Sequence, residues 1–164
     1  MKCQSEYPYP KLDSIVRNPQ SARLIMHSYA GDVSEDTAIH QYLFQSVILK
    51  EKDEEVSEIL EQIAEVEMHH FQYLAELIQQ LGVYPVFVDP IVDKNEFWTS
   101  RYVCYDVEVE DILEMDMEAE KKAIMQYQSL IHVIEDQQVK EALRRIVVDE
   151  KIHLEIFEKL LSVR

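Results

Sequence analysis

Glycine is almost missing from this chain: only 2 of its 164 residues are glycine, and only 5 are proline. Sheets with many tight turns depend on these two residue types, so their scarcity favours long uninterrupted helices. Apolar residues nevertheless make up 47% of the sequence, as in a globular protein rather than a disordered one. At this length we expect one domain with a sizeable core.

Long apolar runs and basic clusters are also lacking. No stretch approaches the roughly 20 apolar residues that cross a bilayer, and the first residues contain no apolar segment of the signal-peptide kind. We therefore expect a cytoplasmic protein. Acidic residues outnumber basic ones by 32 to 16, which gives a formal net charge of −16. Because such a chain lacks a phosphate-neutralising patch, we expect neither nucleic acid nor membranes as partners.

Cysteine is scarce, with Cys3 and Cys104 as its two examples, and no CxxC pair occurs. The absence of that motif excludes a rubredoxin-type iron centre or a zinc ribbon within these residues. A structural disulfide between the two is not expected in the cytosol.

Helix start and stop signals divide the chain into an arm, residues 1–18, and a helical domain, residues 19–164. Asn18-Pro19 is a good helix start, with Asn as N-cap and Pro at the first helical position. Asp53 is placed to cap a second helix, and Gly82 to end it. We expect helices at about 19–50, 53–81, 107–135 and 138–162.

Residues 83–106 separate the second predicted helix from the third. The segment contains Pro85, Pro90, β-branched residues and aromatics, and it shows no helical period. It is long for a simple turn and can carry the chain back along a bundle. The sequence thus predicts an all-α, antiparallel four-helix bundle with one long crossover between helices two and three.

The predicted helices contain an internal repeat. Glu35-Asp-Thr-Ala-Ile-His-Gln-Tyr42 is matched 85 residues later by Glu120-Lys-Lys-Ala-Ile-Met-Gln-Tyr127. Each copy is followed, about 30 residues on, by a Glu-x-x-His motif, which spans 67–70 in the first copy and 150–153 in the second. The bundle therefore consists of a duplicated hairpin, and each copy carries two carboxylates and one imidazole.

The two Glu-x-x-His motifs have the spacing of metal ligands. Residues three apart on a helix project to the same side, so each motif can direct an oxygen and a nitrogen to one point. Four buried carboxylates would lose hydration at a cost on the order of several kcal/mol each. Two divalent ions would balance the four negative charges, and neutral imidazoles would complete the coordination. The alternative, a metal-free ion-pair network, has too few inward-facing Lys or Arg.

These motifs resemble the ferritin-like dinuclear carboxylate proteins, in which two helices each provide a Glu and two others each provide Glu-x-x-His. The likeness covers about residues 19–163 and is greatest to rubrerythrin-type domains and manganese catalases. Tyr29-Ala30-Gly31, ahead of the first Glu, is typical of the rubrerythrins. The resemblance implies a ferritin-like fold and a centre of two iron or two manganese ions.

The resemblance also implies a role for each of six ligands. Glu35 and Glu120 would be terminal ligands, one for each ion. Glu67 and Glu150 would bridge the two ions. His70 and His153 would each bind one ion.

Two tyrosines accompany the predicted ligands. Tyr42 and Tyr127 lie seven residues beyond Glu35 and Glu120, two helical turns away on the same face. We expect each tyrosine to hydrogen-bond a carboxylate of the opposite copy and to assist catalysis; simple packing is the alternative. The glutamines beside them, at 41 and 126, lie off the inward face and are predicted to make helix–helix contacts.

The leading functional hypothesis is an oxidoreductase acting on hydrogen peroxide or dioxygen. Peroxidase action would require an external electron-donor protein, whereas catalase-like disproportionation requires no reductant. Rubrerythrins carry a further carboxylate three residues before the terminal ligand Glu120, but Met117 stands there in this chain. This departure and the missing CxxC motif slightly favour a catalase-like or oxidase role.

Other interpretations remain open from the residues alone. A ferroxidase or iron-storage protein fits the same ligands, and a metal-free structural bundle is a third alternative. Iron and manganese accept the same oxygen and nitrogen ligands. We expect a homodimer, formed through exposed apolar residues of the first two helices such as Ile25, Val47 and Ile48.

Overall fold

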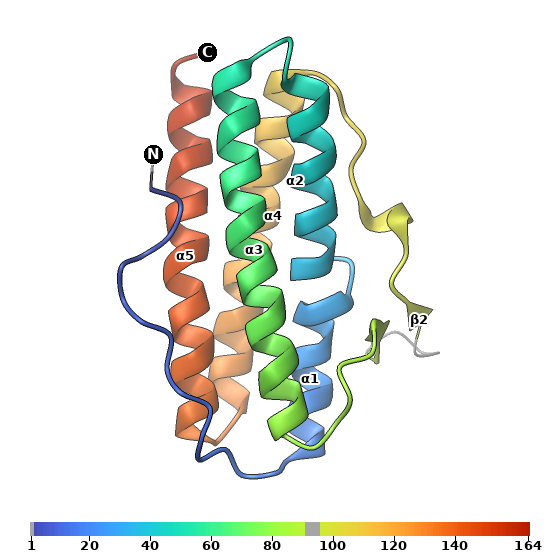
Figure 1. Cartoon of the computed structure of the whole chain (residues 1–164), viewed down its shortest axis with the longest axis vertical. Helices are drawn as coiled ribbons and strands as arrows, with labels where there is room; N and C mark the ends of the chain where they lie inside the picture. Colours follow the sequence, from blue (N-terminus) through green and yellow to red (C-terminus); the bar gives the residue numbers. More distant parts are fainter. Residues whose placement is uncertain (1, 91–95) are drawn as a thin grey trace.

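The computed structural model describes residues 2–90 and 96–164, and these form an antiparallel helical bundle (Figure 1). Its helices are α1 (Pro19–Ala30), α2 (Glu35–Leu49), α3 (Glu54–Gln80), α4 (Val109–Val133) and α5 (Gln137–Ser162). Helices α1 and α2 follow one another along one side of the bundle and pack on α3, while α4 packs on α5 (Figure 1). The predicted all-α four-helix bundle with one long crossover is therefore confirmed.

The first bundle helix is divided in two, so the prediction of one helix over 19–50 was wrong. The N–H of Gly31 donates to the carbonyl of His27 at 2.8 Å and closes α1. Ser34 then caps α2, because its hydroxyl accepts from the N–H of Thr37 and donates to the Gly31 carbonyl. Glu35 consequently stands at the first position of a new helix rather than in the middle of a long one.

The other helix boundaries follow the capping signals of the sequence. The Asn18 side chain accepts from the Ser21 N–H, with Pro19 at the first helical position. Asp53 caps α3 in the same way, and Asp136 caps α5. Gly82 follows α3 with a φ of +94°, a left-handed conformation that glycine adopts at little cost.

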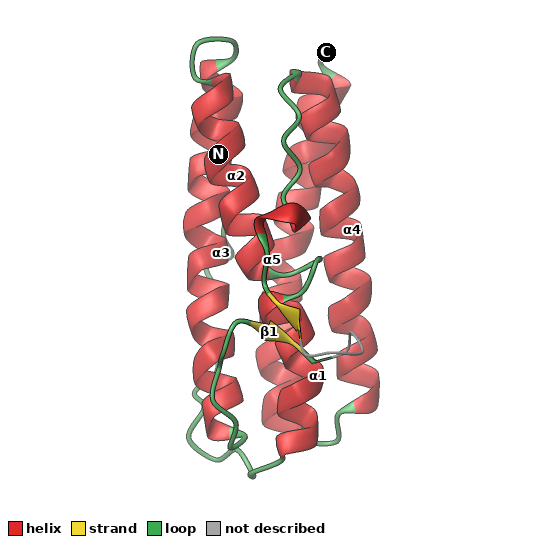
Figure 2. Cartoon of the chain, turned by 90° about the vertical axis from the view of Figure 1, so that its right-hand side faces the viewer, coloured by secondary structure: helices red, strands yellow, loops and turns green. Residues whose placement is uncertain are grey.

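The crossover runs between α3 and α4 and covers the side of the bundle that carries α2 and α4 (Figure 2). It contains a short antiparallel pair, β1 (Val88–Asp89) with β2 (Glu96–Phe97), and a 3₁₀ turn, η1 (Ser100–Tyr102). Part of the predicted crossover, residues 91–95, lies outside the described residues. The Trp98 indole N–H donates to the Thr37 hydroxyl at 2.9 Å, which fastens the crossover to α2.

The core consists of two apolar clusters with a polar layer between them. One cluster joins α1 to the C-terminal half of α3, and it includes Ile25 and Leu74, both with no exposed surface. The other joins α2 to the N-terminal half of α3, and it includes Leu60. Each fully buried Leu or Ile contributes about 1.5–3 kcal/mol, which offsets the cost of burying charge between the clusters. Among the described helices, none is both long and apolar enough to cross a membrane.

The expected dimer surface is only partly present. Val47 is 70% exposed, whereas Ile25 lies in the core and is unavailable to a partner. The inclusion of Ile25 was therefore wrong, because this residue lies on the apolar face of α1 that packs against α3.

Candidate metal centre

The polar layer contains all six predicted ligands, and each is buried. Helix α2 positions one Glu and α4 another, while α3 and α5 each position a Glu and a His three residues apart. The side chains form two overlapping groups, and within each group one donor atom per residue lies within 4.8 Å of the others. The groups are Glu35, Glu67, His70 and Glu150, and Glu67, Glu120, Glu150 and His153.

His70 directs its Nδ1 atom into the first group. This nitrogen lies 2.9 Å from Glu67 Oε2, 3.1 Å from Glu150 Oε1 and 3.7 Å from Glu35 Oε2. One imidazole nitrogen thus faces three carboxylates, two of which belong to both groups.

His153 repeats this arrangement in the second group. Its Nδ1 lies 2.9 Å from Glu67 Oε1, 3.5 Å from Glu150 Oε2 and 3.7 Å from Glu120 Oε1. The two copies of the repeat therefore form two similar half-sites that share Glu67 and Glu150.

The contacts of the other nitrogen, Nε2, show which nitrogen of each imidazole carries the hydrogen. His153 Nε2 lies 2.9 Å from the carbonyl of Cys3, and a carbonyl can only accept, so Nε2 carries hydrogen. His70 Nε2 likewise faces Asp149 Oδ2 at 3.2 Å. In a neutral imidazole the Nδ1 lone pair then points at carboxylate oxygens, and acceptors that face acceptors require a cation between them.

Unpartnered atoms support the same interpretation. Among the described residues, Glu67 Oε1, Glu150 Oε1 and His153 Nδ1 are buried without a well-aligned hydrogen bond. These oxygen and nitrogen atoms are ligands that iron and manganese accept. The residues present therefore fit a dinuclear metal centre.

Burial and the facing charges set the pKa values within the cluster. Burial raises the pKa of Glu35 and of Glu120 well above the ordinary value, and the neighbouring Glu150 raises both further. Burial also opposes ionisation of Glu67, but the facing His153 and His70 hold its pKa well below the ordinary range. Without metal the cluster balances its charge with protons, which divalent ions would displace on binding.

Each tyrosine of the repeat hydrogen-bonds a carboxylate of the opposite copy. The Tyr42 hydroxyl donates to Glu120 Oε1 at 2.5 Å, and the Tyr127 hydroxyl donates to Glu35 Oε1. Burial raises the pKa of both phenols well above the ordinary value, so each remains a neutral donor. The predicted bonds between the copies are thus present, and each fixes one oxygen of its carboxylate.

A cavity of about 230 Å³ reaches the cluster between α2 and α4, beneath the crossover. All four carboxylates contribute to its lining, together with both repeat tyrosines. Small side chains, Ala38, Ala119 and Ala123, form part of its wall, and Tyr102 and Cys104 border it from the crossover. The carboxylate side of the centre is therefore open to a small molecule.

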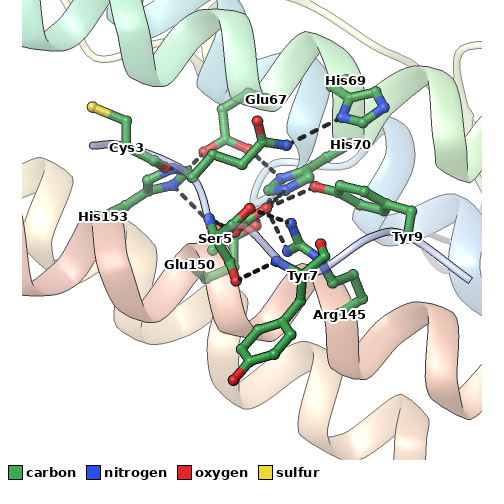
Figure 3. A network of polar contacts seen from close by, with 12 residues as sticks. Cys3, Ser5, Tyr7, Tyr9, Glu67, His69, His70, Arg145, Glu150 and His153 are labelled. Atoms are coloured by element: carbon green, nitrogen blue, oxygen red, sulfur yellow. Dashed lines mark hydrogen bonds and ion pairs between the residues drawn. The ribbon is translucent and has the colours of Figure 1, made fainter.

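The opposite side, which carries the imidazoles, is covered by the N-terminal arm, residues 2–18 (Figure 3). Sequence reasoning missed this network. Asp149 accepts from the Ser5 N–H at 2.8 Å and from the Tyr9 hydroxyl at 2.7 Å, and it forms an ion pair with Nη1 of Arg145 at 2.7 Å. One signal was available, because an inward-facing Arg and Asp four residues apart on one helix form a pair.

Asp116 was also missed as a buried group. Its side chain has no exposed surface, and its Oδ1 accepts from the amides of Gln41 at 2.8 Å and Gln45 at 3.0 Å. Gln41 also accepts from the Cys104 N–H, and Gln126 donates to the Ser28 hydroxyl. Both repeat glutamines therefore make the predicted helix–helix contacts, and Gln41 additionally holds the crossover.

Solved structures with the same fold include a manganese catalase from Anabaena PCC7120. That structure has a TM-score of 0.86 and 24% identity, and the alignment covers 99% of this chain and 80% of the catalase chain. A bacterioferritin from Desulfovibrio desulfuricans has a TM-score of 0.72 and 26% identity, over 87% of this chain and 78% of the bacterioferritin.

Comparison of the sequence with known proteins identifies similar relatives. A probable manganese catalase from Clostridium acetobutylicum is 25% identical over 166 aligned positions, which cover 88% of this chain and 72% of the relative. Residues 31–161 match the model of the rubrerythrin family, and this range includes all six residues of the cluster. The chain belongs to the rubrerythrin family.

Proposed function

We propose that this protein is a dinuclear metal oxidoreductase that disproportionates hydrogen peroxide, as catalases do. One observation carries the proposal: a cavity meets the carboxylate side of the cluster, while hydrogen bonds occupy the outer nitrogens of both imidazoles. Substrate would therefore reach the ions from one side, and the other side would hold the ligands in place.

The cavity suits a very small substrate. Its volume is about 230 Å³, and a water molecule occupies roughly 30 Å³ in the liquid. Hydrogen peroxide or dioxygen fits this space with room for accompanying water, between the four carboxylates and the alanine side chains of its lining.

Each proposed ligand has a role in holding the centre. Glu67 and Glu150 lie in both half-sites and would bridge the ions, whereas Glu35 and Glu120 would each bind one ion. When bound, a pair of iron or manganese ions supplies the two-electron exchange that breaks an O–O bond. Two peroxide molecules then balance the reaction: one is oxidised to dioxygen, and the other takes up its two electrons and two protons to form water.

The proposed function of Tyr42 and Tyr127 is to keep the terminal carboxylates in one orientation. Each phenol donates to Oε1 of a terminal Glu, and in Glu35 the other oxygen, Oε2, is the one that faces His70. Because the phenols also line the cavity, they present hydroxyl groups beside the position that substrate would occupy.

Disproportionation is favoured over peroxidase action by two features of the chain. Met117 packs beside the apolar cluster around Leu60, at the position where rubrerythrins carry a further carboxylate. Within the given residues, no CxxC motif is present to hold an iron centre that would supply electrons. The relative described as a probable manganese catalase also supports this choice.

Ferroxidase action is the second candidate, and the 26% identity to a bacterioferritin favours it. In that case ferrous ions would be substrate, and dioxygen would accept their electrons. The same cavity would admit dioxygen, so the two functions differ in the reactant consumed.

Purified protein, loaded separately with Mn²⁺ or Fe²⁺, distinguishes these functions. We expect two ions per chain and dioxygen release at half the rate of peroxide loss, without added reductant. Peroxide loss that requires a reductant would instead indicate a peroxidase with an external electron donor. Oxidation of excess Fe²⁺ with retention of the product, in a hollow shell of many subunits rather than the expected dimer, would indicate iron storage.

A further inference from the structure

The two half-sites differ in the residue behind each imidazole. Asp149 directly precedes Glu150, and its Oδ2 lies 3.2 Å from Nε2 of His70, in the other copy of the repeat. The corresponding residue of the first copy, directly before Glu67, is Val66. A valine side chain has no hydrogen-bond acceptor, so the repeat by itself provides an acceptor for only one of the two imidazoles.

The N-terminal arm provides the second acceptor. The carbonyl of Cys3 accepts from Nε2 of His153 at 2.9 Å, across a separation of 150 residues in sequence. Figure 3 shows Cys3 beside His153, with the arm passing on toward Tyr9 near the other imidazole. The arm thus replaces an acceptor that the first copy lacks.

The same stretch of arm also holds Asp149. The Ser5 N–H and the Tyr9 hydroxyl donate to its two carboxylate oxygens at 2.8 Å and 2.7 Å. Arg145 is 6% exposed, donates from Nε to the Tyr7 carbonyl at 2.7 Å, and lies 4.1 Å from the centre of the Tyr9 ring. Arm, Asp149 and Arg145 therefore form one network behind the two imidazoles.

We propose that residues 3–9 are positioning residues of the metal centre and that its two ion positions differ in how far they depend on this stretch. The position at Glu35 and His70 has an imidazole backed by a carboxylate. The position at Glu120 and His153 has an imidazole backed by a neutral carbonyl. A carboxylate makes an imidazole a stronger donor, so the first position binds its ion more tightly and the second depends on the arm. This inference rests on the proposed dinuclear centre.

Deletion of residues 2–10, with Met1 retained, tests the proposal by Mn²⁺ titration. We expect the wild-type chain to bind two ions with unequal affinities. The deletion variant should bind the weaker ion about 10- to 100-fold less tightly, the usual effect of losing an outer partner. Its electron paramagnetic resonance spectrum should then show an isolated Mn²⁺ ion in place of a coupled pair.

A rescue variant separates positioning from general destabilisation. Val66→Asp, added to the deletion variant, gives the first copy the carboxylate that the second copy already has, and it should restore the coupled pair. Lys11→Ala in the full-length chain is the matched control, because it changes an exposed side chain of the arm outside residues 3–9; its metal binding should equal that of the wild type.

Two results would overturn the proposal. In the first, the deletion variant binds two ions with wild-type affinities. In the second, the rescue variant has helical structure but does not regain metal binding. If the deletion variant does not retain helical circular dichroism, Asp149→Asn in the full-length chain should weaken the tighter ion alone. Unchanged affinities there would also contradict the proposal. A wild-type chain that binds no metal would instead refute the proposed function.

Discussion

Tyr127 donates a hydrogen bond to Glu35, a residue that lies 92 positions earlier in the chain and in the other copy of the repeat. Each hairpin therefore helps to orient a carboxylate of its partner hairpin. A substitution in one copy should therefore change metal binding at the half-site of the other copy. Removal of a single oxygen atom tests this relationship.

Tyr127→Phe should leave the fold intact, because phenylalanine fills nearly the same buried space. Loss of the hydroxyl removes a hydrogen bond to a buried carboxylate, and we expect metal affinity to fall about 10-fold or more. Metal titration and peroxide turnover measure the effect, and Tyr42→Phe should behave alike through Glu120. Tyr29→Phe is the control: Tyr29 is also buried but stacks on Phe71 and should be neutral. Equal metal affinity in all three variants would contradict an orienting role.

Glu67→Ala should reduce the metal content of the purified protein more than loss of either terminal carboxylate. Glu67 lies in both half-sites, at 2.9 Å from each Nδ1, so its removal affects both ion positions. Elemental analysis after dialysis should find fewer than two ions per chain. Glu65→Ala, an exposed change on the same helix, serves as the control. Full metal content in the Glu67 variant would show that the bridging assignment is wrong.

Much of the centre could be predicted because its residues belong to regular helices. Glu67 and His70 repeat at helical spacing on a face that is otherwise apolar, and Glu35 and Tyr42 recur in the second copy, so periodicity alone places them together. The match to Glu120 then follows from the duplication. Local sequence was sufficient wherever the relevant spacing was helical.

The remaining part of the site depends on contacts that have no sequence period. Cys3 contributes a backbone carbonyl, which any residue carries, and the irregular arm gives no signal of the helix it will contact. Asp149 was one of many acidic residues, and its only signal was its spacing of four residues from Arg145. The helix break before Glu35 was not predicted, because small and apolar residues continue at helical spacing through Gly31. The break depends on the Gly31 bond that closes α1 and on the Ser34 cap that starts α2.

Gly31→Ala should destabilise the fold by about 1–3 kcal/mol, the typical effect of overpacking. An added Cβ would lie 2.6 Å from Nδ1 and from the carbonyl oxygen of His27, too close for ordinary contact. The imidazole would have to leave Asp89, to which it is bonded at 2.8 Å. Urea unfolding of the variant and of Gly31→Ala combined with His27→Ala measures the effect. Much less destabilisation on adding Gly31→Ala to a His27→Ala background would confirm the steric cause, whereas an equal loss would point to the backbone alone.

Asp116 should make stability depend on pH outside the metal centre. Burial raises its pKa to about 7, although the amides of Gln45 and Gln41 act in the opposite direction. The pKa of Asp116 in the folded chain lies above its ordinary value of 3.8, so the folded chain binds this proton more strongly than the unfolded chain does. The stabilisation is complete below about pH 4 and is lost as the pH rises through 7. Asp116→Asn keeps an oxygen acceptor for both glutamines but removes the titration.

A pKa difference of one between the folded and unfolded chain corresponds to about 1.4 kcal/mol. Between pH 4 and pH 7.5 the free energy of unfolding of the variant should therefore rise by on the order of a few kcal/mol relative to that of the wild type. Urea unfolding of both proteins across that range measures the difference, in which other titrating groups cancel. Parallel stability curves would mean that Asp116 ionises normally in the folded chain. The expected result is a difference that shifts in favour of the variant as the pH rises. At the higher pH the buried carboxylate of the wild type must carry a charge that no cation among the described residues neutralises.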